Sequence, residues 1–434
     1  MSRFLLRHAR LGADTIDLVI DDGRITALAP AGSITPDNTT VLHAQGARIL
    51  PSLTDAHTHL REPGQEYKED IASGLTAALA GGFGQVMTMA NTSPVNDTAA
   101  VTRFMQDRAR HSHPHGPRLY PIGALTKGLE GKELAPFAEL AAAGCKALSN
   151  DGRPIAATEI LRRAMEYAAD FGLRVIDHCE DPTLGAGGVM NEGVLSGRLG
   201  LKGIPTIAEA IQVARDVLLA SYLDIPIHLA HISCRASVEI LAAAKAKGVP
   251  VSAETCPHYL LWDENLVEGY RTAAKVNPPL RTVDDVVALR QAVREGIIDI
   301  LATDHAPHAS HEKDAPFDEA PFGISGLDTA LSLTTQLVHM GELTWDDVVR
   351  LWAWEPCRIF GLPSTPIREQ AQAHLILFAE DTTWTVSAET MLSKSTNTPA
   401  LGMELPGRVL AHFIDGNLVF QRTPWPASSL LTTI

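Results

Sequence analysis

Ile49-Leu-Pro-Ser-Leu-Thr-Asp-Ala-His-Thr-His59 ends an apolar, strand-like run with two histidines, His57 and His59. Residues i and i+2 of a β-strand point to the same side, so these imidazoles form a ready chelating pair. An isolated His-x-His is equally typical of two polar residues near a turn. Three further apolar runs of the chain, however, end in the same kind of residue, at His178, His231 and Asp304. This repetition favours a metal site.

These apolar runs alternate with Ala-rich stretches at helical spacing, of which Thr158 to Phe171, followed by Gly172, is the clearest helix. Strands that alternate with helices indicate parallel β/α units. Their number favours a (β/α)8 barrel over an open doubly wound sheet, because no Gly-rich phosphate loop follows the first strand. In a barrel the carboxyl ends of the strands meet on one face, where active sites form. The predicted strands are Gln85–Met89, Leu119–Ile122, Arg174–Ile176, Ile227–Ala230, Pro250–Ala253 and Ile298–Ala302.

Both ends of the chain have a different pattern, typical of short antiparallel strands. Asp17 to Thr26 is an apolar run, an Asp-Gly turn and a second strand, which indicates a hairpin. His374 to Phe378 and Val409 to Val419 resemble strands too, with Asp415-Gly416 as another turn. We therefore expect an α/β protein, a distorted (β/α)8 TIM-type barrel with a small β-sandwich domain built from both termini. The predicted limits are residues 1–50 and 366–434 for the sandwich and residues 51–365 for the barrel.

The composition of the 434-residue chain excludes several classes of protein. Its formal net charge of −15 argues against a nucleic-acid binder, which needs a basic face. No apolar run is long enough for a transmembrane helix, and Arg7 interrupts the apolar N-terminus, so we expect neither membrane insertion nor a secretory signal. The five cysteines are scattered and odd in number, which fits a reduced, cytoplasmic protein.

Other histidines and cysteines have a simpler interpretation. His228 precedes His231 by three residues and therefore lies on the opposite face of its strand, so we interpret it as structural. The histidines of the loop 111–115 follow a helix and are typical of a surface loop. Cys179 and Cys234 have no second ligand pair, so a thiolate zinc site is not favoured. Imidazole with carboxylate suits zinc, with manganese or cobalt as possible substitutes.

Several segments together carry a family resemblance. They are Asp55–Glu69, Ala90–Pro94, Asp177–Glu180, His228–Ser233, Glu254–Tyr259, Val276–Arg281 and Ala302–His308, and the pattern continues through Pro321–Asp328 and Ser393–Pro399. They resemble the signature of dihydroorotases, in the amidohydrolase superfamily. The resemblance covers essentially the whole chain and is to the longer, bacterial type I enzymes.

The resemblance implies a binuclear centre with two Zn²⁺ per chain. His57 and His59 would bind one metal, and His178 and His231 would bind the other. Asp304 would touch the first metal and act as the general acid/base.

A carboxylate must also bridge the two metals, and the sequence leaves two candidates. In the related enzymes the bridge comes from the second Asp of an Asp-Asp-Gly motif, which matches Asp151, although Asn150 stands in place of the first Asp. The other candidate is Lys146, at a strand end where other amidohydrolases carry a carboxylated lysine. We favour Asp151, because its Asp-Gly context is intact.

The implied reaction is the reversible cyclisation of N-carbamoyl-L-aspartate to L-dihydroorotate in pyrimidine biosynthesis. A metal-bridging hydroxide would be the nucleophile. Arg61, Asn91 and His308 would hold the substrate carboxylate, and Asn277 would hydrogen-bond the ring. The polar segment 309–322 would be a flap that closes over the substrate.

Two alternatives and two associations remain. Another cyclic amidohydrolase, such as a hydantoinase or allantoinase, would share the metal chemistry but would not need Arg61, Asn91 and His308 to grip a carboxylate. A non-catalytic dihydroorotase-like partner of aspartate transcarbamoylase would have lost metal ligands, whereas this chain has them all. We expect a homodimer, and an active enzyme that also binds the transcarbamoylase is a further possibility.

Overall fold

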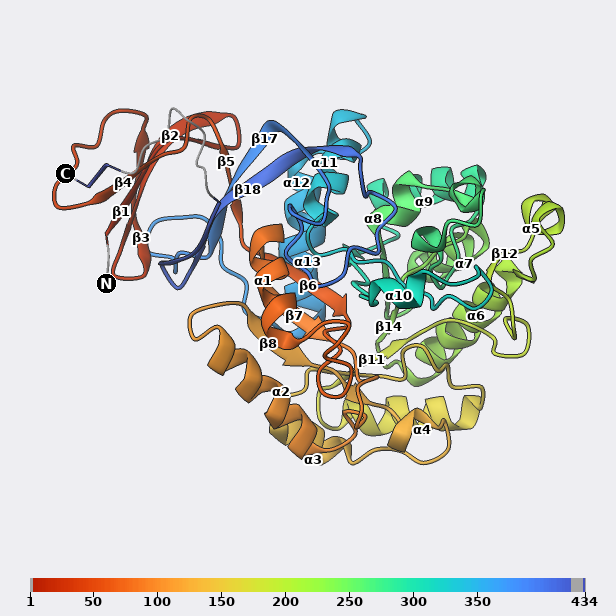
Figure 1. Ribbon diagram of the computed structural model, residues 1–434. Coiled ribbons are helices and arrows are strands. Elements are labelled where there is room, and N and C mark those ends of the chain that lie inside the picture. Colours follow the sequence, from red (N-terminus) through yellow and green to blue (C-terminus); the bar gives the residue numbers. More distant parts are fainter. Residues whose placement is uncertain (1–2, 423–431, 434) are drawn as a thin grey trace.

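Short parallel strands form a barrel at the centre of the computed structural model, which describes residues 3–422 and 432–433 (Figure 1). One parallel sheet has the order β6-β7-β8, and a second has the order β16-β15-β14-β11-β10-β9. The strands are β6 (Leu53–Thr58), β7 (Phe83–Thr88), β8 (Arg118–Pro121), β9 (Gly123–Ala124), β10 (Ala147–Ser149), β11 (Arg174–Asp177), β14 (Ile227–Leu229), β15 (Val251–Thr255) and β16 (Ile300–Leu301).

The two sheets join at both edges. β8 and β9 are consecutive parts of one strand, separated by Ile122, whose N–H donates to the carbonyl of Thr88 on β7 (2.8 Å). At the other edge Thr58 forms a parallel bridge to His305, and the His59 N–H donates to the His305 carbonyl (2.8 Å). The predicted barrel is therefore confirmed. The predicted strand Ile298–Ala302 shortens to β16, and the backbone enters the left-handed region two residues after the predicted end, at Asp304 (φ 46°).

Helices cover the outside of the barrel (Figure 1). The predicted helix is α4 (Thr158–Ala169), with Leu161, Ala164, Met165 and Ala168 buried at helical spacing. It ends before Phe171, because Gly172 is left-handed (φ 65°) and the next N–H returns to the carbonyl of Ala168. The other helices are α1 (Ile71–Gly81), α2 (Ala99–Ser112), α3 (Phe137–Ala143), α5 (Val194–Leu199), α6 (Thr206–Leu223), α7 (Arg235–Ala246), α8 (Pro257–Leu261), α9 (Val283–Arg294), α10 (Ser310–Lys313), α11 (Ala330–His339), α12 (Trp345–Val349) and α13 (Glu355–Phe360). Among the described residues, no helix is both long and apolar enough to cross a bilayer.

The two ends of the chain share a second sheet, at the left of Figure 1. Its strand order is β19-β18-β17-β5-β1-β2-β3, and β4 pairs with both β1 and β20. Its strands are β1 (Phe4–Leu11), β2 (Asp14–Asp21), β3 (Arg24–Pro30), β4 (Thr40–His43), β5 (Arg48–Pro51), β17 (Leu375–Thr385), β18 (Glu404–Ile414), β19 (Asn417–Gln421) and β20 (Thr432–Thr433); a separate pair is β12 (Met190–Asn191) with β13 (Gly203–Ile204).

The terminal sheet has its own apolar core, to which Leu6 and Leu18 contribute from the N-terminal strands and Leu375 and Phe413 from the C-terminal strands. Both predicted hairpins are present. Asp22-Gly23 and Asp415-Gly416 have positive φ at both positions, which matches the right-handed twist of the flanking strands. Only Ser52 separates β5 from β6, so the chain passes directly from this sheet into the barrel. The predicted domain limits themselves stay a prediction.

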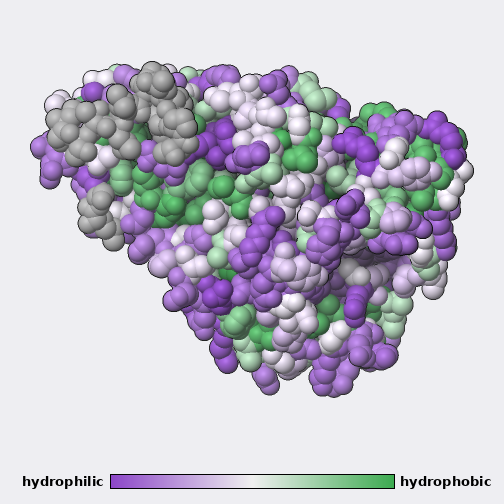
Figure 2. All heavy atoms as spheres, viewed as in Figure 1, coloured by the Kyte–Doolittle hydropathy of each residue, from purple (hydrophilic) through white to green (hydrophobic). Residues whose placement is uncertain are grey.

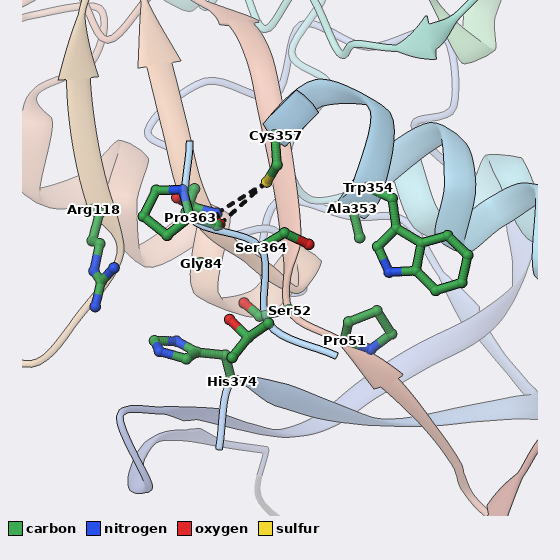
Figure 3. Close-up of a pocket in the computed structure, with 12 residues that line it drawn as sticks. Pro51, Ser52, Gly84, Arg118, Ala353, Trp354, Cys357, Pro363, Ser364 and His374 are labelled. Atoms are coloured by element: carbon green, nitrogen blue, oxygen red, sulfur yellow. Dashed lines mark hydrogen bonds between the residues drawn. The ribbon is translucent and has the colours of Figure 1, made fainter. Parts of the chain in front are cut away.

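A small cavity lies where the barrel meets the terminal sheet (Figure 3). Its lining includes Ser52, Gly84, Arg118, Cys357 and His374. Gly84 and Arg118 stand at the amino ends of β7 and β8, so this cavity is at the end of the barrel where strands begin. Its free volume of about 20 Å³ has room for about one water molecule. It is too small to be a substrate site.

Candidate metal centre

The six predicted ligands all lie at carboxyl ends of barrel strands. His57 and His59 stand at the end of β6, and the other four follow β10, β11, β14 and β16; they are Asp151, His178, His231 and Asp304. All six are buried. Parallel strands present their carboxyl ends on one face of a barrel, which is why residues so distant in sequence meet.

Asp151 lies between the two histidine pairs. Its Oδ1 is 3.5 Å from His57 Nε2, 3.4 Å from His178 Nδ1 and 3.5 Å from His231 Nε2, and its Oδ2 is 3.5 Å from His59 Nε2. Two groups of possible metal ligands therefore share this one carboxylate: His57, His59 and Asp151 form the first, and Asp151, His178 and His231 form the second. This is the geometry of two adjacent cation sites with a common bridge.

The side chains present fit a pair of divalent cations. His57 Nε2 and Asp151 Oδ1 are buried and have no hydrogen-bond partner among the described residues. Buried polar atoms are nearly always paired, so two orphaned atoms 3.5 Å apart indicate a missing positive group. Imidazole nitrogen with carboxylate oxygen is a donor set that suits zinc.

The carboxylates around the histidines also favour the binding of cations. Burial alone would lower the pKa of His57, but Asp151, Glu254 and Asp304 outweigh it and raise that pKa well above its usual value. His178 behaves in the same way: burial lowers its pKa, and contacts with Asp151 and Glu180 raise it to about 10. The carboxylates therefore make a field that retains positive charge in the centre.

Neighbouring groups fix the orientation of three imidazoles. His57 Nδ1 is 2.6 Å from Glu254 Oε1, and His178 Nε2 is 3.0 Å from Glu180 Oε2. The ring of His59 is held through Nδ1, 2.9 Å from the Asn91 amide oxygen. In each case the other ring nitrogen faces the centre. Metal-bound histidines are held in this way, with one nitrogen on the metal and the other hydrogen-bonded to an outer group. Sequence reasoning assigned no role to Glu254 and Glu180, although both lie within segments that carry the family resemblance.

Three residues around the centre have a strained backbone. Arg61, His231 and Asp304 have φ values of 62°, 33° and 46°, in the left-handed region that side chains other than glycine rarely adopt. Such strain persists only where the surrounding structure enforces it, and it concentrates at functional sites. Here it turns the chain so that each side chain points toward the mouth of the barrel.

Lys146 cannot supply the bridging carboxylate. It directly precedes β10, at the amino end of that strand, whereas Asp151 follows the carboxyl end. Its side chain is exposed and lines a separate pocket with Arg174 and Phe360. The alternative of a carboxylated Lys146 is therefore wrong, because the residue lies at the opposite end of its strand from the metal ligands.

The remaining histidines and cysteines lie outside this centre. Neither His228 nor the loop 111–115 contributes to a possible metal group among the described residues. Cys179 does form such a group with Asp177 and Asp216, but a cation is already present there. The Arg215 guanidinium donates to one oxygen of Asp177 and to one of Asp216, both at 2.7 Å, and so places a positive charge between the two carboxylates.

A cavity of about 360 Å³ opens over the metal centre, and Arg61, Asn91 and Asn277 line it together with five of the six predicted ligands. Arg61 is buried, and burial lowers its pKa to about 10, so the guanidinium stays charged at neutral pH. Its contacts among the described residues are with the Pro307 carbonyl (3.1 Å) and the His308 imidazole (3.4 Å), and no ion pair with a carboxylate is among them. A buried, unpaired guanidinium at the wall of a cavity favours an anionic ligand.

His308 lies behind Arg61 and is not part of the cavity wall. Its Nε2 is 3.4 Å from Arg61 Nη2 and 2.8 Å from the carbonyl of Phe322. Burial and the nearby cations lower its pKa to about 3, so the ring is neutral. In this position His308 can hold the Arg61 guanidinium in place from behind.

The predicted flap packs against the cavity and is held by two buried lysines. Pro321, Phe322 and Gly323 line the cavity. Lys313 Nζ donates to the carbonyls of Thr272 (3.0 Å), Lys275 (3.3 Å) and Pro321 (2.8 Å), and Lys275 Nζ donates to those of Phe317 (2.6 Å) and Asp318 (3.1 Å). Burial and the neighbouring Lys275 lower the pKa of Lys313 to about 7. These bonds tie the flap to the segment that precedes Asn277.

We expect Lys313→Met to loosen the flap. The substitution keeps the length of the side chain but leaves the carbonyls of Thr272, Lys275 and Pro321 without their donor, which is costly for buried groups. Amide hydrogen exchange of residues 309–323 should accelerate at least about tenfold, a factor that corresponds to about 1.4 kcal/mol. The exposed Lys132→Met variant is the control, and equal exchange in the two variants would contradict the role of Lys313.

The bridge is tested by a pair of alanine variants. Asp151→Ala should abolish stoichiometric zinc binding, because it removes the carboxylate that both ligand groups share. Lys146→Ala should bind as much zinc as the wild type, since Lys146 lies at the other end of the strand. Metal analysis after dialysis measures both, and loss of zinc from the Lys146 variant would refute the assignment.

Solved structures share this fold. An L-hydantoinase (dihydropyrimidinase) from Arthrobacter aurescens is 20% identical, with a TM-score of 0.85 over 99% of this chain and 98% of that chain. A dihydropyrimidinase from Brevibacillus agri NCHU1002 is 21% identical, with a TM-score of 0.80 over 96% and 95% of the two chains. At such low identity they establish the architecture alone.

Closer relatives are found by sequence. A family model described as dihydro-orotase-like matches residues 46–237. A dihydroorotase from Geobacter metallireducens is 44% identical over 409 residues, which are 94% of this chain and 96% of that protein. A dihydroorotase from Pelobacter propionicus is 45% identical over the same shares. With such identity over nearly the whole length of both chains, this protein belongs to the dihydroorotase family of cyclic amide hydrolases.

Proposed function

We propose that this enzyme interconverts L-dihydroorotate and N-carbamoyl-L-aspartate with the help of two zinc ions, as a step of pyrimidine biosynthesis in the cytoplasm. The observation that carries the proposal is the unpaired, buried Arg61 in the same cavity as the two ligand groups that share Asp151. The names of the relatives agree with it. Both ends of this reaction carry a free carboxylate that a guanidinium can bind through two parallel hydrogen bonds.

The ligand sets define what the cations would do. When bound, two divalent cations lower the pKa of a shared water and polarise a carbonyl oxygen, which is the chemistry that opens an amide ring. His57 and His59 would hold one cation, His178 and His231 the other, and Asp151 would join them.

Asp304 is placed to handle the proton. Its Oδ1 is 3.2 Å from His59 Nε2 and 3.5 Å from His57 Nε2, and the residue lines the cavity. It lies next to the first ligand group, so its carboxylate can take a proton from the attacking water and deliver it to the departing ring nitrogen. In the reverse direction the same carboxylate takes a proton from the ureido nitrogen as the ring closes.

The cavity wall would select the substrate. Arg61 and Asn91 would bind its carboxylate, and Asn277 would hydrogen-bond the ring. His308 would act through Arg61, since it contacts the guanidinium and does not line the cavity. A hydantoin or allantoin ring has no carboxylate to neutralise Arg61, which favours dihydroorotate over the substrates of those hydrolases. Homodimer formation and association with aspartate transcarbamoylase stay predictions.

We expect Asp304→Asn to keep the fold and most of its zinc but to lose activity by a factor of about 10²–10⁴, the usual contribution of a general acid/base. The amide has nearly the shape of the carboxylate and cannot accept the proton. Ring opening of dihydroorotate, followed by its ultraviolet absorbance, measures the loss. Undiminished turnover would refute the acid/base role.

The substrate is tested with the zinc-loaded wild type and Arg61→Met. The wild type should hydrolyse dihydroorotate and leave hydantoin and allantoin unchanged. Arg61→Met should raise KM for dihydroorotate at least about tenfold, because a charged hydrogen-bonding partner of the carboxylate is lost. Turnover of hydantoin or allantoin with dihydroorotate inert would overturn the proposed substrate.

A further inference from the structure

Glu254 lies behind the metal centre, between two histidines from different strands. Glu254 follows Ala253 on β15 and is 1% exposed. Its Oε1 is 2.6 Å from Nδ1 of His57, a predicted metal ligand, and its Oε2 is 3.1 Å from Nε2 of His228. Glu254 therefore links His57, a residue of the metal centre, to His228, which lies outside the centre.

The register of the sheet builds this arrangement. β14 and β15 are parallel neighbours, in which His228 pairs with Ser252. Ser252 and Glu254 are two residues apart and project from the same side of β15, so both face His228. The imidazole of His228 accordingly spans them, with Nδ1 2.8 Å from Ser252 Oγ and Nε2 3.1 Å from Glu254. It is fully buried and packs edge-on against Phe360.

The chemistry of the donors fixes the proton positions. An ionised carboxylate only accepts hydrogen bonds. Each oxygen of Glu254 lies within hydrogen-bond distance of an imidazole nitrogen, Oε1 of His57 Nδ1 and Oε2 of His228 Nε2, so the carboxylate accepts from both rings. His57 then donates from Nδ1, and its other ring nitrogen, Nε2, faces Asp151 Oδ1 at 3.5 Å and is the one left to bind a cation. That nitrogen is the orphaned one, and a metal ligand needs it unprotonated.

The other imidazoles of the centre have weaker support. His59 is held by the neutral amide of Asn91. His178 is held by Glu180, whose side chain is 15% exposed, whereas that of Glu254 is 1% exposed. A charge in a dry environment interacts more strongly than one screened by water, so the carboxylate behind His57 has the largest effect.

We propose that Glu254, itself braced by His228, is a positioning residue for the first cation site. It sets the tautomer and orientation of His57 and places a negative charge behind that ring, which raises the affinity of the site formed by His57, His59 and Asp151 for a divalent cation. The inference rests on the proposed metal centre and does not depend on which substrate the enzyme turns over.

Zinc affinity tests the proposal directly. The full-length protein is stripped with a chelator and titrated with Zn²⁺ in competition with a chromogenic chelator, which reports the two sites separately from activity. Glu254→Gln keeps the size of the side chain and an oxygen that can accept from His57, but it removes the charge. We expect one of the two zinc sites to weaken by about 10- to 100-fold, the usual effect of losing an outer contact of a metal ligand. The second site should keep its affinity within about twofold.

Glu209→Gln is the matched control. Glu209 is also buried, at 3% exposure, and its carboxylate is bonded to Ser233 and Arg281 and to none of the predicted ligands. Both zinc affinities should remain as in the wild type. His228→Gln is a second variant, which keeps a donor for Glu254 and should weaken the first site less than Glu254→Gln does.

Thermal unfolding of the metal-free proteins separates positioning from folding. The proposal is supported if Glu254→Gln has a lower zinc affinity at the first site while its unfolding midpoint equals that of Glu209→Gln. Equal zinc affinity of Glu254→Gln and wild type at both sites overturns it. If Glu254→Gln does not fold, His228→Gln is measured in its place. A weaker first zinc site in that variant supports the proposal, and wild-type affinity at both sites overturns it. If the wild type leaves dihydroorotate unchanged while the zinc loss persists, the proposed substrate is rejected and the role of Glu254 stands.

Discussion

The structure depends on one constraint: four imidazoles and two carboxylates are buried together at the mouth of a barrel. Asp151 lies within 3.5 Å of all four histidine rings, and the central atoms of His57 and Asp151 have no partner in the described chain. Such a cluster is costly unless positive charge fills it. Two divalent cations meet that requirement, and the same cations would supply the chemistry of ring opening.

Strained backbone and supporting contacts behind the histidines hold this centre in place. Asp304 and His231 leave their strands through left-handed backbone, which only a rigid surrounding enforces. Glu254 and Glu180 hold two of the rings from outside the centre. The predicted metal ligands are therefore set in place by a sheet whose register is fixed elsewhere, and Lys313 and Lys275 hold the flap segment against the cavity.

Basic side chains near the cavity differ in sign from the net charge of the chain. The chain has a net charge of −15, and hydrophilic side chains cover most of the face in Figure 2. Near the cavity, however, Arg61 contacts the Pro307 carbonyl and the His308 imidazole, and Lys275 and Lys313 are buried against backbone carbonyls. Exposed charges are screened within about 10 Å, whereas a buried charge such as that of Arg61 is screened much less. An acidic protein can for this reason bind an anionic ligand at this cavity.

The sequence by itself determined the elements and the residue types of the site. Strand-like runs ending in His57, His178, His231 and Asp304 predicted a barrel with metal ligands at one face, and the Asp-Gly turns predicted the terminal hairpins, because strand periodicity and turn chemistry are local properties. The tertiary structure decided what depends on register and strand direction. It placed Asp151 between the two pairs and Lys146 at the far end of β10, moved His308 behind Arg61, and brought Glu254 to His57 across 197 positions of sequence. No local pattern encodes such distances, since they arise only when the barrel closes.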